Sequence, residues 1–192
     1  MSFLSRLFGK KIKKEAKIVL LGASGAGKTT LVRYLETGQA VEQDAKTTLG
    51  IDIRKTPIKV DGWSFKAIDV GGQELYQKTF WSLGVSQSDA VIYVIDGTTK
   101  PDAEDDKFET SLFQFEYALG IVDEDTPLLI LINKQDLTEQ NPVSTEDGMK
   151  LYGMDQLTGR SMIVLPSSAK YGDGVDTAME WLVDKVNEKL NA

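Results

Sequence analysis

Residues 22–29 read Gly22-Ala23-Ser24-Gly25-Ala26-Gly27-Lys28-Thr29, between the apolar run 18–21 and a helical pattern that starts at residue 30. A strand, a glycine-rich loop and a helix in this order are typical of a phosphate-binding loop. Successive backbone N–H groups of such a loop point at phosphate oxygens, and the N-terminus of the helix adds the positive end of its dipole. We expect Lys28 to reach the outer phosphates and the Thr29 hydroxyl to bind Mg²⁺. The stretch predicts a nucleoside triphosphate but leaves the base open.

A second motif, Asn133-Lys134-Gln135-Asp136, indicates guanine as the base. It follows the apolar run 127–132, and at the carboxyl end of a buried parallel strand it faces the ligand crevice. The Asp136 carboxylate can accept hydrogen bonds from both N1–H and the 2-amino group of guanine, whereas adenine has no amino group there. We expect Asn133 to tie this loop to its neighbours and the stem of Lys134 to cover the base plane.

A third motif, Ser168-Ala169-Lys170, supports the choice of guanine. It follows the apolar strand-like run 162–165, and the Ala169 N–H can donate to the guanine O6 atom.

A fourth motif, Asp69-Val70-Gly71-Gly72-Gln73, follows the strand-like stretch 63–68. Asp69 is expected to hold Mg²⁺ through a water molecule. Gly72 can offer its N–H to the terminal phosphate because no side chain stands in the way. Gln73 can orient an attacking water, so this motif predicts hydrolysis of the terminal phosphate.

The combination resembles the Ras superfamily of small GTPases, and within it the Arf family. The Arf-like features are the double glycine of 69–73, the sequence Thr47-Thr48-Leu49-Gly50, the leucine after Asp136, and Gly172-Asp173-Gly174 before a last amphipathic helix. The resemblance covers about residues 16–190. It implies an α/β P-loop NTPase fold of the small G-protein kind, a three-layer α/β/α arrangement around a six-stranded, mostly parallel sheet with one antiparallel strand.

The resemblance also implies a set of site residues. Thr48 matches the switch threonine, which senses Mg²⁺ and the γ-phosphate. The catalytic residues would then be Gln73, Lys28 and Thr48, and the metal would be held by Thr29, Thr48 and Asp69. The residues expected to bind GTP or GDP are Ser24, Gly25, Ala26, Gly27, Lys28, Thr29, Thr30, Thr48, Gly72, Asn133, Lys134, Asp136, Ser168, Ala169 and Lys170.

Composition indicates one globular domain. The chain has 192 residues, of which 41% are hydrophobic, and a formal net charge of −7. The acidic charge argues against a nucleic-acid partner. The absence of cysteine and histidine excludes disulfides, thiolate or imidazole metal sites and histidine acid–base chemistry. No apolar stretch approaches the length that spans a bilayer. We expect a monomer in the cytoplasm, with peripheral membrane association that depends on the bound nucleotide.

Strand and helix patterns alternate along the chain. The expected strands lie at about 17–22, 50–60, 63–69, 89–95, 127–132 and 161–167, and the expected helices at about 27–37, 74–86, 104–119, 144–152 and 174–190. Asp61-Gly62 predicts a tight hairpin, which makes the second and third strands antiparallel. Ser144 is expected to cap its helix. The last helix places Val175, Ala178, Met179, Leu182, Val183, Val186 and Leu190 on one face, which we interpret as core.

The first fourteen residues differ from the rest, because they carry five basic residues and no acidic one. On a helix, Phe3, Leu4, Leu7 and Phe8 share one face, so residues 1–14 are expected to form a basic amphipathic helix ahead of a GTPase domain at 15–192. Such a helix can lie in the interface of an anionic membrane. It can also dock permanently on the domain, or be a tail that binds a protein or stays disordered. In the Arf family the helix is stored with GDP and released with GTP.

The sequence departs from the Arf pattern at several positions. Ser2 stands where a myristoylated member has glycine, so an acyl chain is not expected. Ser24 lies close to the γ-phosphate, where a side chain can alter hydrolysis in either direction. The positions of the family's aromatic effector triad are aliphatic: Ile51, Ile68 and Leu83. The interswitch, from Thr48 to Asp69, is about two residues longer than in Arf proteins.

The sequence therefore predicts a GTP/GDP switch that hydrolyses GTP slowly. Residues 44–48 hold no arginine, so a GTPase-activating protein is expected to supply one. An exchange factor and effectors are expected as further protein partners. One alternative is a nucleotide-locked adaptor with negligible turnover. Another is a metabolic P-loop kinase, which is disfavoured because residues 133–136 and Gln73 have no role there.

Overall fold

Strand β1 (Lys14–Leu21) runs through the middle of the sheet, because its second half is apolar on both faces. The computed structural model describes residues 14–42, 48–53, 56–72, 77–102 and 104–191. β1 pairs in parallel with β4 (Trp63–Val70) and with β5 (Ala90–Asp96). Two more parallel strands, β6 (Leu128–Asn133) and β7 (Met162–Pro166), complete that side of the sheet.

The other side of the sheet is antiparallel. Both β2 (Ile51–Ile53) and β3 (Ile58–Val60) pair with β4, so the strand order is β2-β4-β1-β5-β6-β7 with β3 beside β4. The predicted hairpin is confirmed: Val60 pairs with Trp63, and Asp61 and Gly62 have φ angles of 44° and 81°. The predicted fold class is confirmed. Within the described residues the sheet has seven strands where six were predicted, because the strand expected at 50–60 forms two short segments.

The break between β2 and β3 has a defined length. Ile53 pairs with Ile68, and Ile58 pairs with Phe65. Four residues therefore separate the paired positions on one side, while two residues separate them on β4. The surplus of two equals the extra length that the sequence indicates for the interswitch. Pro57 lies inside the break, where it could not donate a hydrogen bond to the sheet.

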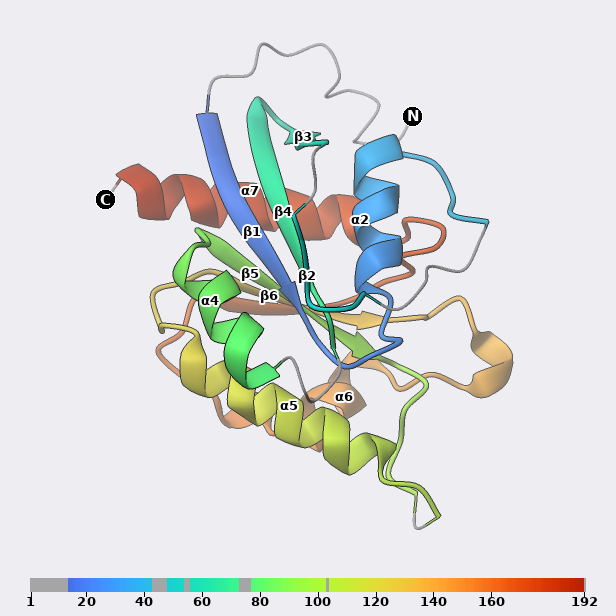
Figure 1. Ribbon diagram of the computed structural model, residues 1–192. Helices are drawn as coiled ribbons and strands as arrows, with labels where there is room; N and C mark the ends of the chain where they lie inside the picture. The colour runs from blue at the N-terminus through green and yellow to red at the C-terminus, as the bar shows by residue number, and fades with distance from the viewer. Residues whose placement is uncertain (1–13, 43–47, 54–55, 73–76, 103, 192) are drawn as a thin grey trace.

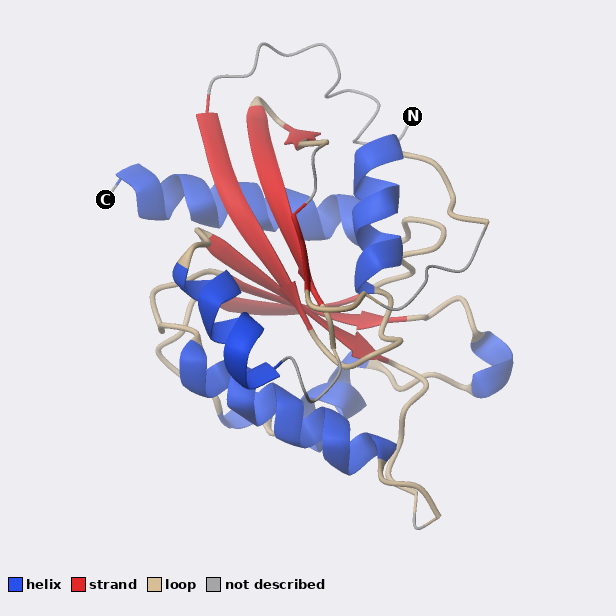
Figure 2. Ribbon diagram, viewed as in Figure 1, coloured by secondary structure: helices blue, strands red, loops and turns tan. Residues whose placement is uncertain are grey.

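Helices cover both faces of the sheet (Figures 1 and 2). On one face, Ile18 and Leu20 of β1 pack with α2 (Lys28–Thr37) and α7 (Val175–Asn191). On the other face, Val19 and Leu21 pack with residues from α4 (Ser82–Ser86) and α5 (Lys107–Ile121). Partly buried residues of α6 (Thr145–Leu151) join this second core. The alternation of β1 side chains thus builds a three-layer α/β/α molecule.

The helices begin and end close to the predicted positions, with two differences. The helix predicted at 74–86 is described from residue 77, as a π-helical turn, η1 (Gln77–Trp81), followed by α4. The helix predicted at 104–119 begins only at Lys107. The side chains of Asp102 and Asp105 each accept a hydrogen bond from the backbone N–H two residues later, at 2.9 and 3.0 Å, and such local turns compete with helix formation.

Smaller features agree with the sequence. Ser144 caps α6 by accepting a hydrogen bond from the Asp147 N–H. Two short 3₁₀ helices, η2 (Thr138–Gln140) and η3 (Met154–Gln156), flank α6. The predicted face of α7 is buried except for Leu190 in its last turn, which is 48% exposed. Among the described residues there is no helix with the length and apolarity that crossing a membrane requires.

The predicted N-terminal helix lies outside the described residues, apart from its last residue. Lys14 is the first residue of β1, and its Nζ donates to the Asn187 side chain on α7 and lies over the Trp63 ring. Lys14, which was predicted to end the N-terminal helix, is thus part of the central strand.

Candidate nucleotide-binding site

The predicted site residues gather at one edge of the sheet. The loop after β1 carries residues 22–27, and the loops after β6 and β7 begin at residues 134 and 167. All three strands are parallel, so their carboxyl ends open on the same crevice. The start of α2 lies at this edge as well (Figure 1).

The glycine loop turns sharply into α2. Gly25 and Gly27 have φ angles of 79° and 103°, which favour glycine, and Gly27 is the N-cap of α2. A Cβ atom at Gly27 would lie 2.3 Å from the Asn133 Nδ2 atom, so only glycine fits there. Ser24 and Gly25 are exposed at the tip of the loop, while Ala26 is buried. The loop can therefore present its backbone N–H groups to a phosphate chain.

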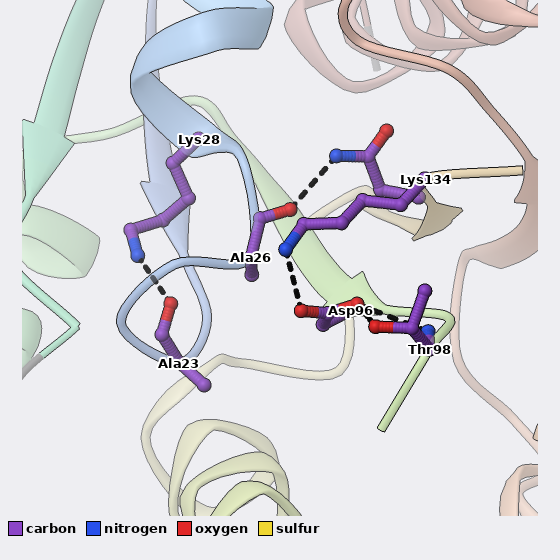
Figure 3. Close-up of polar contacts among 7 residues, drawn as sticks. Ala23, Ala26, Lys28, Asp96, Thr98 and Lys134 are labelled. Carbon is purple, nitrogen blue, oxygen red and sulfur yellow. Dashed lines mark hydrogen bonds and ion pairs between the residues drawn. The ribbon is translucent and has the colours of Figure 1, made fainter. Parts of the chain in front are cut away.

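Lys28 lies beneath this loop. The side chain is only 6% exposed, and its Nζ donates to the Gly22 carbonyl oxygen at 2.8 Å. It also donates to the Ala23 carbonyl oxygen at 2.9 Å (Figure 3). Burial lowers the pKa of Lys28 to about 8, and the nearby charge of Asp69 acts in the opposite direction. The ammonium group is thus held close to the loop in a place where a phosphate would favour its charged form.

Three oxygen ligands converge beside Lys28. The Thr29 hydroxyl donates to Asp69 Oδ2 at 2.6 Å, the Thr48 hydroxyl donates to the same oxygen at 3.0 Å, and the two hydroxyls are 2.9 Å apart. These residues come from α2, from the segment before β2, and from β4. Hydroxyl and carboxylate oxygens suit Mg²⁺, a hard cation that keeps several ligands from water and phosphate. In the described parts of the chain, no cluster of three or more acidic residues offers a competing metal site.

The double glycine after β4 lies directly on the phosphate-binding loop. A Cβ atom at Gly72 would come within 2.4 Å of the Gly22 carbonyl oxygen and 2.5 Å of the Ser24 nitrogen. Gly71 is fixed on both sides: its N–H donates to Gly50 at 2.8 Å, and its carbonyl accepts from Trp81 Nε1 at 3.2 Å. The requirement for glycine at position 72 therefore has a steric cause.

A pocket of about 200 Å³ lies where the base is expected. Its lining residues come from the glycine loop, α2, the segment after α2, and the loops after β6 and β7: Gly27, Thr30, Val41, Asn133, Lys134, Asp136, Leu137, Ala169 and Lys170. Most of the residues predicted to bind the base are among them. Ser168 is fully buried instead, and its hydroxyl accepts from the Tyr171 N–H, which makes it a support of the loop.

Asn133 joins three loops of the site, as the sequence predicts. Its Nδ2 donates to the Ala26 carbonyl at 2.8 Å, and its Oδ1 accepts from the Ala169 N–H at 2.8 Å and from the Ser167 hydroxyl at 3.3 Å. The Ala169 N–H, which we expect to donate to guanine O6, is thus directed to Asn133 here. It would have to be shared with the base.

Sequence reasoning missed Asp96 and Thr98. Asp96 ends β5, and its Oδ2 binds the Lys134 ammonium at 2.6 Å, while its Oδ1 accepts from the Thr98 N–H and hydroxyl (Figure 3). The pair holds the end of the Lys134 side chain, whose stem lines the pocket. The sequence did contain an indication of Asp96, because an aspartate directly after an apolar parallel strand lies at the same edge of the sheet as the other motifs.

The comparison with known proteins decides the family. The family model described as "ADP-ribosylation factor family" matches residues 1–186. The chain belongs to this family, the Arf family. An ADP-ribosylation factor-like protein 3 from Chlamydomonas reinhardtii is 34% identical over 97% of this chain and 99% of its own length. ADP-ribosylation factor-like proteins 1 from Saccharomyces cerevisiae and Caenorhabditis elegans are 31% and 30% identical, each over 98% of this chain and over 96% and 97% of their own lengths.

Membership in the Arf family confirms the predicted resemblance and makes this chain a small GTPase of the P-loop fold. The guanine nucleotide and Mg²⁺ go with that family assignment, and the residues described above have the chemistry to hold both. Gln73, the predicted water-positioning residue, lies outside the described residues.

The three positions of the Arf aromatic triad do not form one exposed patch. Ile68 is buried and Ile51 is half-buried, while Leu83 is 48% exposed. Leu49 and Ile53, which flank Ile51, are exposed by 70% and 66%. The surface next to the site is therefore aliphatic at these positions.

Proposed function

We propose that this Arf-family protein is a GTP/GDP switch that hydrolyses GTP slowly and couples its nucleotide state to reversible membrane association. The observation that supports the switch is the convergence of Thr29, Thr48 and Asp69 on one point. Thr48 and Asp69 are the two ends of the interswitch, so an Mg-nucleotide held at this point bears on both ends of the β2–β3–β4 segment.

Catalysis in this site is positional and electrostatic. When bound, Mg²⁺ neutralises charge that develops on the phosphate oxygens. Lys28 adds a positive charge from beneath the loop, Gly72 offers its N–H to the terminal phosphate, and Gln73 orients the water. Full rate then depends on an arginine supplied by a GTPase-activating protein, as expected when residues 44–48 contain none.

The first experiment tests binding and turnover. The nucleotide retained on purification is identified, and GTP hydrolysis is followed under single- and multiple-turnover conditions with Mg²⁺. We expect guanine nucleotide, measurable but slow turnover, and a large loss of turnover in Gln73→Leu with binding retained. Tight binding of GTP without any turnover would favour the nucleotide-locked adaptor.

Membrane association is proposed on the sequence of residues 1–13, which carry four basic residues, no acidic residue and an apolar set that shares one helical face. A short helix of this kind binds through buried apolar area and attraction to anionic lipid, and its binding is weak and reversible unless a second anchor is present. GTP can shift the balance only by the difference in its affinity for the stored and released forms of the segment.

The second experiment is flotation with liposomes that contain or lack an anionic lipid, in GDP and in a non-hydrolysable GTP analogue. We expect binding with the GTP analogue on anionic liposomes and a loss of binding as salt rises. Equal binding in both nucleotide states would show that the segment is not coupled to the site.

A further inference from the structure

Gln114 lies where α5 passes under the double glycine. It is 2% exposed, and its Nε2 donates to the Gly72 carbonyl oxygen at 3.3 Å. The two residues are 42 positions apart in the sequence. The contact connects the core face of α5 to the loop on which the terminal phosphate is expected to act.

The two polar atoms of the Gln114 amide differ in their hydrogen bonding. Its Oε1 is buried and makes no hydrogen bond with any part of the chain that the structure describes. Burying an amide with one unpaired group is costly, and an apolar side chain of similar size would avoid this cost. Phe115 and Ala118, on the same buried side of α5, are apolar. The reason for a glutamine at this position therefore lies in the one bond that it makes.

That bond acts on a peptide with little freedom. The Gly72 backbone is in contact with the phosphate-binding loop, and Gly71 is already held by Gly50 and Trp81. The Trp81 contact holds the Gly71 carbonyl, which lies in the same peptide as the Gly72 N–H. Among the described side chains, Gln114 is the donor to the Gly72 carbonyl, so Gly72 is anchored on both sides.

We propose that Gln114 is a positioning residue for the switch: it anchors Gly72 at its carbonyl and, together with the Trp81 contact to Gly71, keeps Gly72 in the place from which its N–H faces the terminal phosphate of GTP. The inference rests on the proposed function, in which that N–H binds the γ-phosphate. GDP lacks this phosphate. Loss of the Gln114 bond therefore weakens binding of GTP more than binding of GDP, since only a differential interaction shifts such a balance.

The test compares Gln114→Met, which keeps the volume and removes the donor, with Ser111→Ala. Ser111 lies one turn earlier on the same buried side of α5, and its hydroxyl bonds to Tyr152, away from Gly72. Dissociation constants for GDP and for a non-hydrolysable GTP analogue are measured with Mg²⁺. In Gln114→Met we expect the preference for the GTP analogue over GDP to fall by about two- to tenfold, the worth of one neutral hydrogen bond. Ser111→Ala should keep the parental ratio.

Thermal unfolding of the GDP forms measures how far each substitution disturbs core packing, separately from its effect on the ratio of the two dissociation constants. A ratio in Gln114→Met equal to that of the parent overturns the inference, and so does an equal fall in Ser111→Ala. If Gln114→Met cannot be purified, Gln114→Asn keeps the amide but shortens its reach by one methylene, and the same fall is expected. The parent protein serves as the check on the proposed function. If the parent has no affinity for GTP or never hydrolyses it, that function fails; if the parent behaves as proposed and the variants match it, only the role of Gln114 fails.

Discussion

Lys28 combines burial with a charge that a phosphate ligand needs. Its pKa is lowered to about 8 by burial, against an ordinary value of 10.5. In the unliganded protein the unfolded chain therefore binds more protons between these two values. Stability should rise with pH across that window and be insensitive to this group below it. A bound phosphate reverses the shift, because it favours the ammonium form.

This reversal predicts a pH dependence of nucleotide binding. Below about pH 7.5 Lys28 is protonated with or without the nucleotide, so it should contribute little pH dependence to the affinity for nucleotide. The affinity should fall by up to about tenfold per unit as the pH rises above 8, because binding then requires uptake of one proton. Titration calorimetry in buffers of different ionisation enthalpy measures that uptake. Lys28→Met should bind more weakly at every pH and should lose the slope; a slope that persists would assign the proton to another group.

Asp136 lines the pocket in which the base is expected. Asp136→Asn should weaken GTP binding by about 2–3 kcal/mol, because a charge-assisted pair with two guanine donors is lost. The amide should instead suit the carbonyl of xanthine, so xanthosine triphosphate should compete better in the variant than in the parent. Competition binding measures both, with Asp184→Asn on the exposed side of α7 as the control. Unchanged GTP affinity in Asp136→Asn would remove the assignment of the base.

Asn133 and Lys134 show what sequence can and cannot predict at this scale. The link from Asn133 to the glycine loop was predictable, since both motifs follow parallel strands and must meet at one edge. The pairing of Lys134 with Asp96 was not predicted, because Asp96 belongs to no motif and its role depends on β5 and β6 being neighbours. The position of Asp96 at this edge could be inferred, but its pairing with Lys134 requires the strand order, which a single sequence does not provide.

Among the elements, the interswitch differs most from expectation. A continuous strand was predicted at 50–60, and apolar and polar residues alternate in both β2 and β3. The two segments nevertheless pair with β4 in registers that differ by two residues. Because a shift of two residues keeps each side chain on its own face, the alternation of apolar and polar residues does not reveal the break. Pro57 is the residue of the sequence that indicates it.

The register offset makes a prediction about length. Deleting Thr56 and Pro57 removes the surplus, and residues 53, 54, 55 and 58 would then face 68, 67, 66 and 65 in one continuous ladder. We expect the backbone amides of β2 to exchange hydrogen more slowly in this variant, with the fold and nucleotide binding retained. Thr56→Gly with Pro57→Gly changes the same positions without changing the length, and it should not slow exchange. Equal exchange in the deletion variant and the parent would show that the register is set elsewhere.

At the scale of the whole molecule, charge is distributed unevenly. The chain carries a net charge of −7 although residues 1–13 contain four basic residues and no acidic one. Residues 14–192 are therefore more acidic than the whole. An acidic domain is repelled by an anionic surface within about a Debye length, so attraction to such a membrane has to come from the N-terminal segment.

Deleting residues 1–13 is therefore expected to abolish flotation with anionic liposomes. It should also speed the release of GDP, if the stored segment stabilises the GDP form. The deletion ends before Lys14, because Lys14 belongs to β1 and bonds to Asn187 on α7. Leu4→Ser with Leu7→Ser keeps all four basic residues and removes apolar area, so it should weaken binding to liposomes and make what remains more sensitive to salt. Fluorescent GDP release measures the exchange rate. A deletion variant that floats as well as the parent, or releases GDP at the parental rate, would separate the N-terminal segment from the switch.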